Sequence, residues 1–297
     1  MPELPDITLY IEALEARLIG EELQSVSLRS PFLLRTVEPR PQDLLNKPVT
    51  TCHRVGKRIA IGVDDQYWLV IHLMIAGRLH WYDKGRKIPA TSSLLQIDFP
   101  GGSLTLTEAG SKKRASVHIL EGIDSLTELD PQGLEVLEAD CTTFARRLTQ
   151  RNHTLKRALT SPSLFSGIGN AYSDEILHRA RLSPVSLTQS LSDEEIVRLF
   201  DATQEVLTTW LDRLRRENSG KFPKKVTAFR EGMAVHGKYN QPCPVCQTRV
   251  QRIRYVGRET NYCPRCQTNG KVLADRALSR LLKSDWPRTI EELEQKS

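Results

Sequence analysis

The sequence predicts an α+β protein made of a β domain, a helical domain and a small metal-binding hairpin. Short runs rich in β-forming residues fill the chain from Val26 to about Leu120, and helical periodicity replaces them after residue 138. Two Cys-x-x-Cys pairs follow near the end of the chain. Strands followed by helices, without regular alternation, are typical of α+β architecture.

Composition narrows the class of protein. The chain has 297 residues, of which 39% are hydrophobic and 26% charged, as in a folded globular protein of two domains and an appendage. Its longest apolar run, residues 67–75, is far shorter than the roughly 20 residues of a membrane span. The acidic Glu3 and Asp6 replace the lysines of a secretory signal. We therefore expect no membrane partner and a cytoplasmic, nucleoid-associated protein.

Positive charge is concentrated in one region. The net charge is +6, but the stretch from Lys221 to Lys283 holds 14 basic and 3 acidic residues. Such a one-sign region favours a polyanion such as nucleic acid as the partner. An acidic protein partner would fit the same count.

The first element is a helix over residues 5–19. Apolar residues recur at helical spacing and Gly20 ends the pattern. If Met1 is removed, which the small Pro2 permits, Pro2 becomes a terminal secondary amine. An α-amino group titrates near ~7.7–8, so part of it is nucleophilic at neutral pH.

The residues at the chain start therefore have two interpretations. The amine of Pro2 can attack a sugar C1′, expel a base and form a Schiff base, while Glu3 moves protons at the same centre. Alternatively, Pro2 and Pro5 simply start the helix and Glu3 favours its N-terminus.

The β domain is expected to be a sandwich or flattened barrel with the first helix at one edge. Its predicted strands cover residues 26–29, 59–63, 67–75, 94–99, 104–107 and 117–120, and the third should be central.

Polar residues within this domain are candidates for contacts with a nucleic acid. Lys57 follows Gly56 directly before a strand, and His72 interrupts the apolar strand. Residues 110–114 form a basic loop with Lys112, Lys113 and Arg114, a composition that suits phosphate contacts. The structural alternatives are a solvent-facing turn lysine, a core histidine and a loop that keeps the surface soluble.

An acidic, loop-like stretch around Asp130 and Pro131 separates the β domain from the helical one. Helices are expected over residues 140–150, 154–160 and 170–180, followed by a long helix after the capping box of Ser192 and Glu195. The turn from Gly167 to Asn170 opens the third of these helices. Its backbone N–H groups and side-chain amide suit a phosphate.

Four cysteines, Cys243, Cys246, Cys263 and Cys266, form two Cys-x-x-Cys pairs separated by 16 residues. In a reducing compartment this spacing supplies the tetrahedral thiolates of one structural Zn²⁺, with no open position for catalysis. The segment between the pairs alternates through Val250, Arg252 and Arg254, as expected of a basic hairpin.

Together these motifs resemble the formamidopyrimidine-DNA glycosylase and endonuclease VIII family, in the family's order and through residue 267. They are Met1 to Pro5, Lys57, Gly167 to Glu175, and Val235 to Cys266. The resemblance implies a bifunctional DNA glycosylase and abasic-site lyase of base excision repair. Its fold would join an N-terminal β-sandwich, a helix–two-turn–helix domain and a zinc hairpin.

The resemblance also assigns residue roles. Pro2 matches the Schiff-base nucleophile and Glu3 the acid/base. Lys57 matches a lysine that assists elimination, and Arg258 matches the arginine of the hairpin that grips phosphates. Asn170 and Lys156 match phosphate-binding positions. The implied partner is damaged double-stranded DNA, bound by a monomer that needs no organic cofactor.

These assignments divide the chain into a catalytic domain (1–122), a linker (123–135), a DNA-binding helical domain (136–232), a zinc finger (233–267) and an extension without an assigned role (268–297). Two features depart from the family pattern. Asp6 replaces a usual glutamate, and residues 108–114 lack the aromatic wedge of relatives that prefer 8-oxoguanine. This difference favours oxidised pyrimidines as substrates. A non-catalytic lesion-binding protein and an RNA-binding zinc-ribbon protein remain the alternative classes.

Overall fold

The computed structural model describes residues 1–88, 93–109, 112–224, 226–227, 229–255, 258–275, 279–281 and 283–295, without the side chains of Tyr255, Arg258, Asp285 and Glu294. The chain divides into two compact units. The first comprises Met1–Gln132 with Trp210–Ala228, and the second Gly133–Thr209 with Phe229–Ser297.

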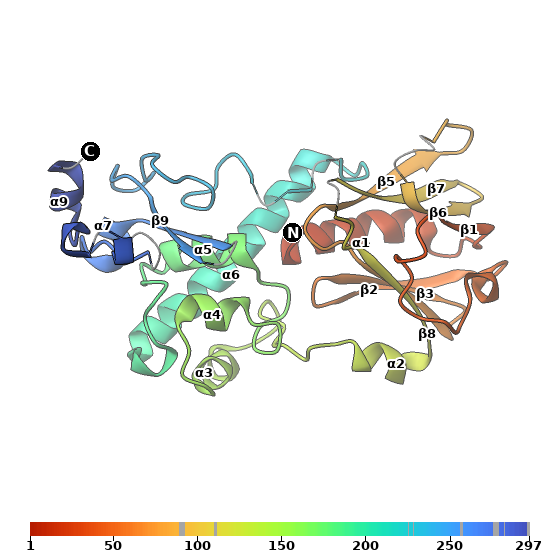
Figure 1. Ribbon diagram of the computed structural model, residues 1–297. Coiled ribbons are helices and arrows are strands. Elements are labelled where there is room, and N and C mark those ends of the chain that lie inside the picture. Colours follow the sequence, from red (N-terminus) through yellow and green to blue (C-terminus); the bar gives the residue numbers. More distant parts are fainter. Residues whose placement is uncertain are drawn as a thin grey trace. The chain divides into compact units, whose positions relative to one another are not determined.

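Two four-stranded antiparallel sheets form the first unit within the described part of the chain (Figure 1). One has the order β1 (Ser25–Leu28), β6 (Ser93–Phe99), β7 (Gly102–Glu108) and β5 (Gly77–Asp83). The other has the order β2 (Val49–Val55), β3 (Arg58–Val63), β4 (Tyr67–His72) and β8 (Ser116–Glu121). Helix α1 (Leu4–Leu18), the 3-10 turn η1 (Pro41–Leu44) and α2 (Gly122–Glu128) complete this unit.

Helix α1 joins the two sheets through one hydrophobic core. Its buried residues Ile7 and Leu14 belong to the same cluster as Leu69 of β4 and Leu104 of β7. Such shared burial of apolar area is the main force holding helix and sheets together. The hydroxyl of Tyr10 also accepts the N–H of Leu79 at 3.3 Å, which ties α1 to β5.

The expected strand pattern is largely confirmed, with three differences. Strands β2 and β5 were not predicted, because polar residues such as His53 and His80 obscure the apolar pattern. The central strand β4 ends at His72 instead of continuing to residue 75. Residues 122–128, expected to be irregular, form α2, whose Leu126 packs against Trp68 and Val70.

The second unit begins with helices. They are α3 (Cys141–Thr149), α4 (Leu155–Thr160), α5 (Asn170–Arg179), the 3-10 turn η2 (Thr188–Ser190) and α6 (Asp193–Asn218), whose last turns belong to the first unit. The predicted capping box starts α6. The Ser192 N–H donates to Glu195 at 3.1 Å, and the Glu195 N–H donates to the Ser192 hydroxyl at 3.3 Å.

A hairpin and three short helical segments complete the second unit. They are β9 (Gln251–Tyr255), β10 (Arg258–Tyr262), α7 (Pro264–Thr268), η3 (Lys283–Asp285) and α9 (Ile290–Gln295). In the extension, the sequence places leucine and alanine residues at helical spacing, namely Leu273, Ala277, Leu278, Leu281 and Leu282. Of these, Ala277, Leu278 and Leu282 lie outside the described residues. Within the described ranges, every helix is too short or too polar to span a lipid bilayer.

Candidate functional site

The start of the chain is buried and held by its own carboxylates. Pro2 is buried, Glu3 is the N-cap of α1 and only 2% exposed, and Asp6 is fully buried. The Asp6 carboxylate accepts the Glu3 N–H at 2.9 Å. The helix-starting role considered for Pro5 and Glu3 is therefore real, but burial of two carboxylates at a chain terminus also creates a polar site inside the unit.

Two tight backbone positions bring cations towards this terminus. Gly56 has φ +61 in the turn between β2 and β3, which suits glycine and presents Lys57. A Cβ at Gly77 would collide with the carbonyl oxygen of Leu73, so only glycine fits directly before Arg78.

The surroundings favour a neutral amine at the chain start. Burial is the largest effect and lowers the pKa of the Met1 amine from its ordinary value of 8.0. The carboxylates of Glu3 and Asp6 oppose the shift, whereas Arg78 and Lys57 add to it. An amine here is thus more often deprotonated, and so nucleophilic, than one in water.

His72 lies near the cations Arg58 and Lys57. It is half-buried in β4, opposite Arg58 of β3 and Ser116 of β8. Burial first, and then Arg58 and Lys57, lower its pKa to about 4. The imidazole is therefore neutral at pH 7 and can donate or accept a hydrogen bond without carrying charge.

The basic loop after β7 is organised by Glu108. The Glu108 carboxylate accepts the N–H groups of Arg114 at 2.8 Å and Ala115 at 3.0 Å. The Lys113 ammonium donates to the backbone carbonyl oxygen of Glu108. The side chains of Lys112, Lys113 and Arg114 are exposed, as phosphate contacts require. Gly110 and Ser111 of this predicted loop lie outside the described residues.

In the second unit, the predicted phosphate-binding residues contact other parts of the protein. Asn170 begins α5, and its side-chain amide donates to the Glu259 carbonyl of β10 at 2.8 Å. Lys156 of α4 donates to the Asn170 carbonyl at 2.7 Å and pairs with Asp174 at 2.5 Å. Their contact with phosphate stays a prediction, and it would have to compete with these bonds or use their remaining hydrogen-bonding capacity.

Two adjacent acids of α5 connect the helices to the segment before the zinc finger. Oδ2 of Asp174 lies 2.8 Å from Nδ1 of His236. It accepts a hydrogen bond when Nδ1 carries a proton, as in the charged ring or in the neutral Nδ1–H tautomer. Glu175 accepts the backbone N–H groups of Ala234, Val235 and His236 at 2.7–2.9 Å. Burial raises the pKa of Glu175, whereas these three bonds act in the opposite direction.

Replacing Glu175 by glutamine is expected to destabilise the second unit by about 3 kcal/mol. One acceptor oxygen becomes an amide N–H₂ that faces backbone donors, so at least one buried N–H loses its partner. Urea unfolding measures the change. Glu205→Gln, which removes an exposed ion pair with Arg179, is the matched control and should cost less than about 1 kcal/mol. Equal effects of the two variants would contradict the argument.

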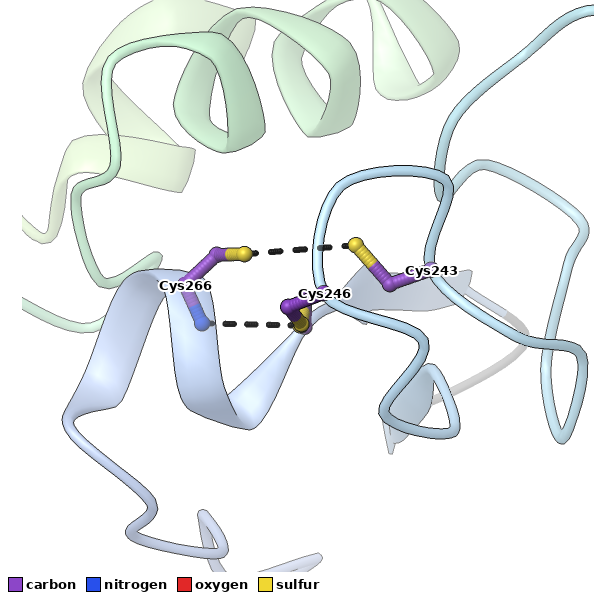
Figure 2. Close-up of side chains that lie close together, drawn as sticks. Cys243, Cys246 and Cys266 are labelled. Atoms are coloured by element: carbon purple, nitrogen blue, oxygen red, sulfur yellow. Dashed lines mark hydrogen bonds between the residues drawn. The ribbon is translucent and has the colours of Figure 1, made fainter.

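The four predicted zinc ligands come together. Their sulfur atoms all lie within 4.8 Å of one another, with Cys243 and Cys266 at 3.9 Å (Figure 2) and Cys246 and Cys263 at 3.3 Å. Sulfur atoms around a tetrahedral zinc with ~2.3 Å bonds lie ~3.8 Å apart, so the cluster fits this ion. Four thiolates at such distances repel one another unless a cation lies among them.

Several residues at these sites were missed by sequence reasoning. Arg78 lies in an unpredicted strand, and His178, whose Nε2 lies 3.3 Å from Sγ of Cys243, occupies a helix that gave no motif beyond its start. A signal that the sequence did offer was the pair Asp174 and Glu175, two adjacent acids within α5, both of which are buried. The backbone of Arg258 begins β10, but its side chain lies outside the description.

Comparison with known proteins gives three matches in the order of the structural parts. Residues 1–114 match the formamidopyrimidine-DNA glycosylase N-terminal domain, 130–217 its H2TH domain, and 240–269 the zinc finger found in FPG and IleRS. These parts define the class, a zinc-finger DNA glycosylase of DNA repair, and confirm the predicted fold. The chain belongs to the formamidopyrimidine-DNA glycosylase family.

Individual relatives support this assignment. The formamidopyrimidine-DNA glycosylase of Heliobacterium modesticaldum is 31% identical over 278 residues, which cover 90% of this chain and 100% of the relative. That of Pelotomaculum thermopropionicum is 29% identical and covers 90% and 99%. Among solved structures, Lactococcus lactis Fpg in complex with abasic-site DNA has a TM-score of 0.79 at 25% identity, with coverage of 90% and 99%. MutM with DNA containing carbocyclic 8-oxo-G has a TM-score of 0.78 at 25% identity.

Proposed function

We propose that this protein removes oxidised bases from double-stranded DNA and cleaves the resulting abasic site through a Schiff base on Pro2. One observation carries the proposal. The chain start is buried with Glu3, and Lys57 and Arg78 lie close enough to lower the pKa of an amine there. Relatives solved with abasic-site and 8-oxo-G DNA support the same class of substrate.

The chemistry would follow from these groups. The Pro2 nitrogen adds to C1′ while the C1′–N bond breaks, and the base departs with the bonding electrons and takes up a proton. Glu3 protonates O4′ as the sugar ring opens, which leaves an iminium at C1′. The iminium acidifies C2′–H. Loss of this proton expels the 3′ phosphate with the C3′–O electrons, and water then releases Pro2.

Residues of both units would bind the DNA phosphates. A base inside a duplex must leave the stack before C1′ can be reached, so phosphates on both sides have to be held. We assign this to Lys57, His72 and the loop carrying Lys112, Lys113 and Arg114 in the first unit. In the second unit, Lys156, Asn170 and Arg258 would serve. One structural zinc would support the hairpin that carries Arg258.

Borohydride trapping with abasic-site duplex DNA tests the proposal. Reduction of the Schiff base should give a covalent protein–DNA complex. Absence of any trapped complex would leave the non-catalytic lesion-binding alternative.

Trapping is expected to increase with pH, because only the neutral amine attacks. Arg78→Gln should move the midpoint to higher pH, since Arg78 helps to lower the pKa of the Met1 amine and should act in the same direction on an amine at Pro2. His72, with a pKa of about 4, should contribute no titration between pH 5 and 8. Single-turnover trapping across this range measures the midpoint. Arg86→Gln is the control, because it removes the same charge from an exposed arginine after β5. A midpoint that Arg78→Gln leaves in place or lowers would contradict this explanation.

A panel of duplexes, each with one defined lesion, tests the substrate preference. Residues 108–114 contain no aromatic residue to fill the space left by an extruded purine. We therefore expect oxidised pyrimidines to be excised faster than 8-oxoguanine. The reverse order would reject the preference while leaving the lyase reaction intact.

A further inference from the structure

The segment that follows the zinc finger, residues 270–295 and called the tail below, has no role in the site described so far. The zinc-finger family model ends at residue 269. The matches to the relatives from Heliobacterium and Pelotomaculum span 99–100% of the relatives' own length but only 90% of this chain. A role for the tail therefore has to come from its own contacts.

The tail folds back on itself directly after α7. Lys271 and Thr289 form an antiparallel bridge, and the Val272 N–H donates to the Arg288 carbonyl at 2.8 Å. The Ile290 N–H donates to the Gly270 carbonyl at 3.0 Å. Val272 and Ile290 are buried. The two ends of the tail thus fix each other by backbone bonds and apolar packing.

Two hydrogen bonds then attach the tail to the zinc hairpin. The N–H of Leu273 donates to the hydroxyl of Tyr262, the last residue of β10, at 2.7 Å. The N–H of Arg254 in β9 donates to Oδ2 of Asp275 at 2.7 Å. Asp275 is only 2% exposed. Burying a carboxylate this deeply costs free energy unless it is hydrogen-bonded, so the hydrogen bond to β9 is needed to stabilise Asp275 in its buried position.

The two attachments lie at opposite ends of the hairpin. Tyr262 precedes the zinc ligand Cys263, where the metal would already hold the strands. Arg254 pairs with Glu259 next to the tip, far along the strand from the cysteines. An isolated two-stranded hairpin is marginally stable in water, and the end without a metal is the one that needs support.

We propose that Asp275 is a positioning residue that holds the hairpin tip for DNA binding. Its carboxylate accepts the backbone N–H of Arg254, one residue before β9 ends at Tyr255, and β10 begins at Arg258. This role rests on the proposed function, because Arg258 is the arginine assigned there to phosphate. The tail is accordingly a brace that this chain adds to its zinc finger.

Asp275→Ala in the full-length, zinc-loaded protein tests the role. Hydrogen exchange of the Arg254 amide should become at least about tenfold faster, because its charge-assisted bond is lost. The Kd for duplex DNA with an abasic-site analogue should rise about three- to tenfold. The single-turnover rate at saturating DNA should stay unchanged, since Pro2 and Glu3 belong to the other unit. Asp275→Asn, which keeps an acceptor oxygen, should give intermediate exchange and affinity.

Glu292→Ala is the matched control. Glu292 also accepts a backbone N–H, that of Arg288 at 2.7 Å, but its bond stays within the tail and is exposed. It should leave Arg254 exchange and Kd as in the wild type. Faster exchange without weaker DNA binding, or weaker binding without faster exchange, would overturn the proposal. If Asp275→Ala lost its zinc, Asp275→Asn would decide by the same two readouts.

The exchange measurement needs no catalysis, so it separates this inference from the proposed function. A wild-type protein that gives no borohydride-trapped complex would reject the lyase reaction. An Arg254 amide that exchanges equally fast in wild type and Asp275→Ala would reject the brace.

Discussion

Replacing Pro2 by leucine is expected to reduce the yield of borohydride-trapped complex at least about a hundredfold. Leucine is too large to permit removal of Met1, so the terminal amine would be displaced by one residue, up to ~3.8 Å along the chain. A misplacement of 1 Å in a reacting group can already cost ~10²-fold. Intact-mass measurement of wild type and variant establishes which amine each protein carries.

Glu3→Gln tests the proton-transfer half of the same site. Glutamine keeps the size of this buried side chain but cannot donate and accept the proton, which is typically worth ~10²–10⁴-fold. Glu12→Gln is the control on the same helix, because it alters an exposed ion pair with Arg215. DNA affinity should stay near wild type in all three variants. Trapping that survives both Pro2→Leu and Glu3→Gln would remove the proposed mechanism.

The sequence predicted those parts of the fold that have a clear local pattern. Helix α6 has an apolar face and a capping box, and the strands around Ile61 and Leu69 are mostly apolar. Strand β5 lacked such a pattern, because its alternate residues Arg78 and His80 are only half-buried. Helix α2 was missed for a related reason, since one buried leucine, Leu126, fixes it.

The candidate site was predictable where covalent chemistry dictates residue type. Cysteine pairs and a terminal proline carry their chemistry in the sequence itself. The contacts that support them depend on the tertiary fold, as with Glu175, which bonds to N–H groups about 60 residues further along the chain. The Asp275 bond to β9 had no sequence signal, because a single aspartate in a basic segment usually faces solvent.

Cys263→Ala is expected to remove the zinc and unfold the hairpin. Zinc contributes ~10–16 kcal/mol to such sites, which is comparable with the whole stability of a typical domain. The loss of structure should extend from the hairpin to the start of α5, because the Asn170 side chain donates a hydrogen bond to the Glu259 carbonyl of the hairpin. DNA affinity should fall at least about tenfold, since the phosphate contacts assigned to the hairpin would be lost. Unit 1, whose core is formed by α1 and the two sheets, should melt as in the wild type.

Metal analysis, DNA titration and hydrogen exchange of residues 251–262 measure these effects together. Cys141→Ala is the matched control, because Cys141 is a lone, half-buried cysteine at the start of α3, outside the cluster. It should keep about one zinc per chain and bind DNA normally. A chelator should reproduce the Cys263→Ala phenotype in the wild type, and added Zn²⁺ should reverse it. If zinc were lost while exchange and DNA affinity stayed unchanged, the metal would not support the hairpin, and the four thiolates would need a different explanation.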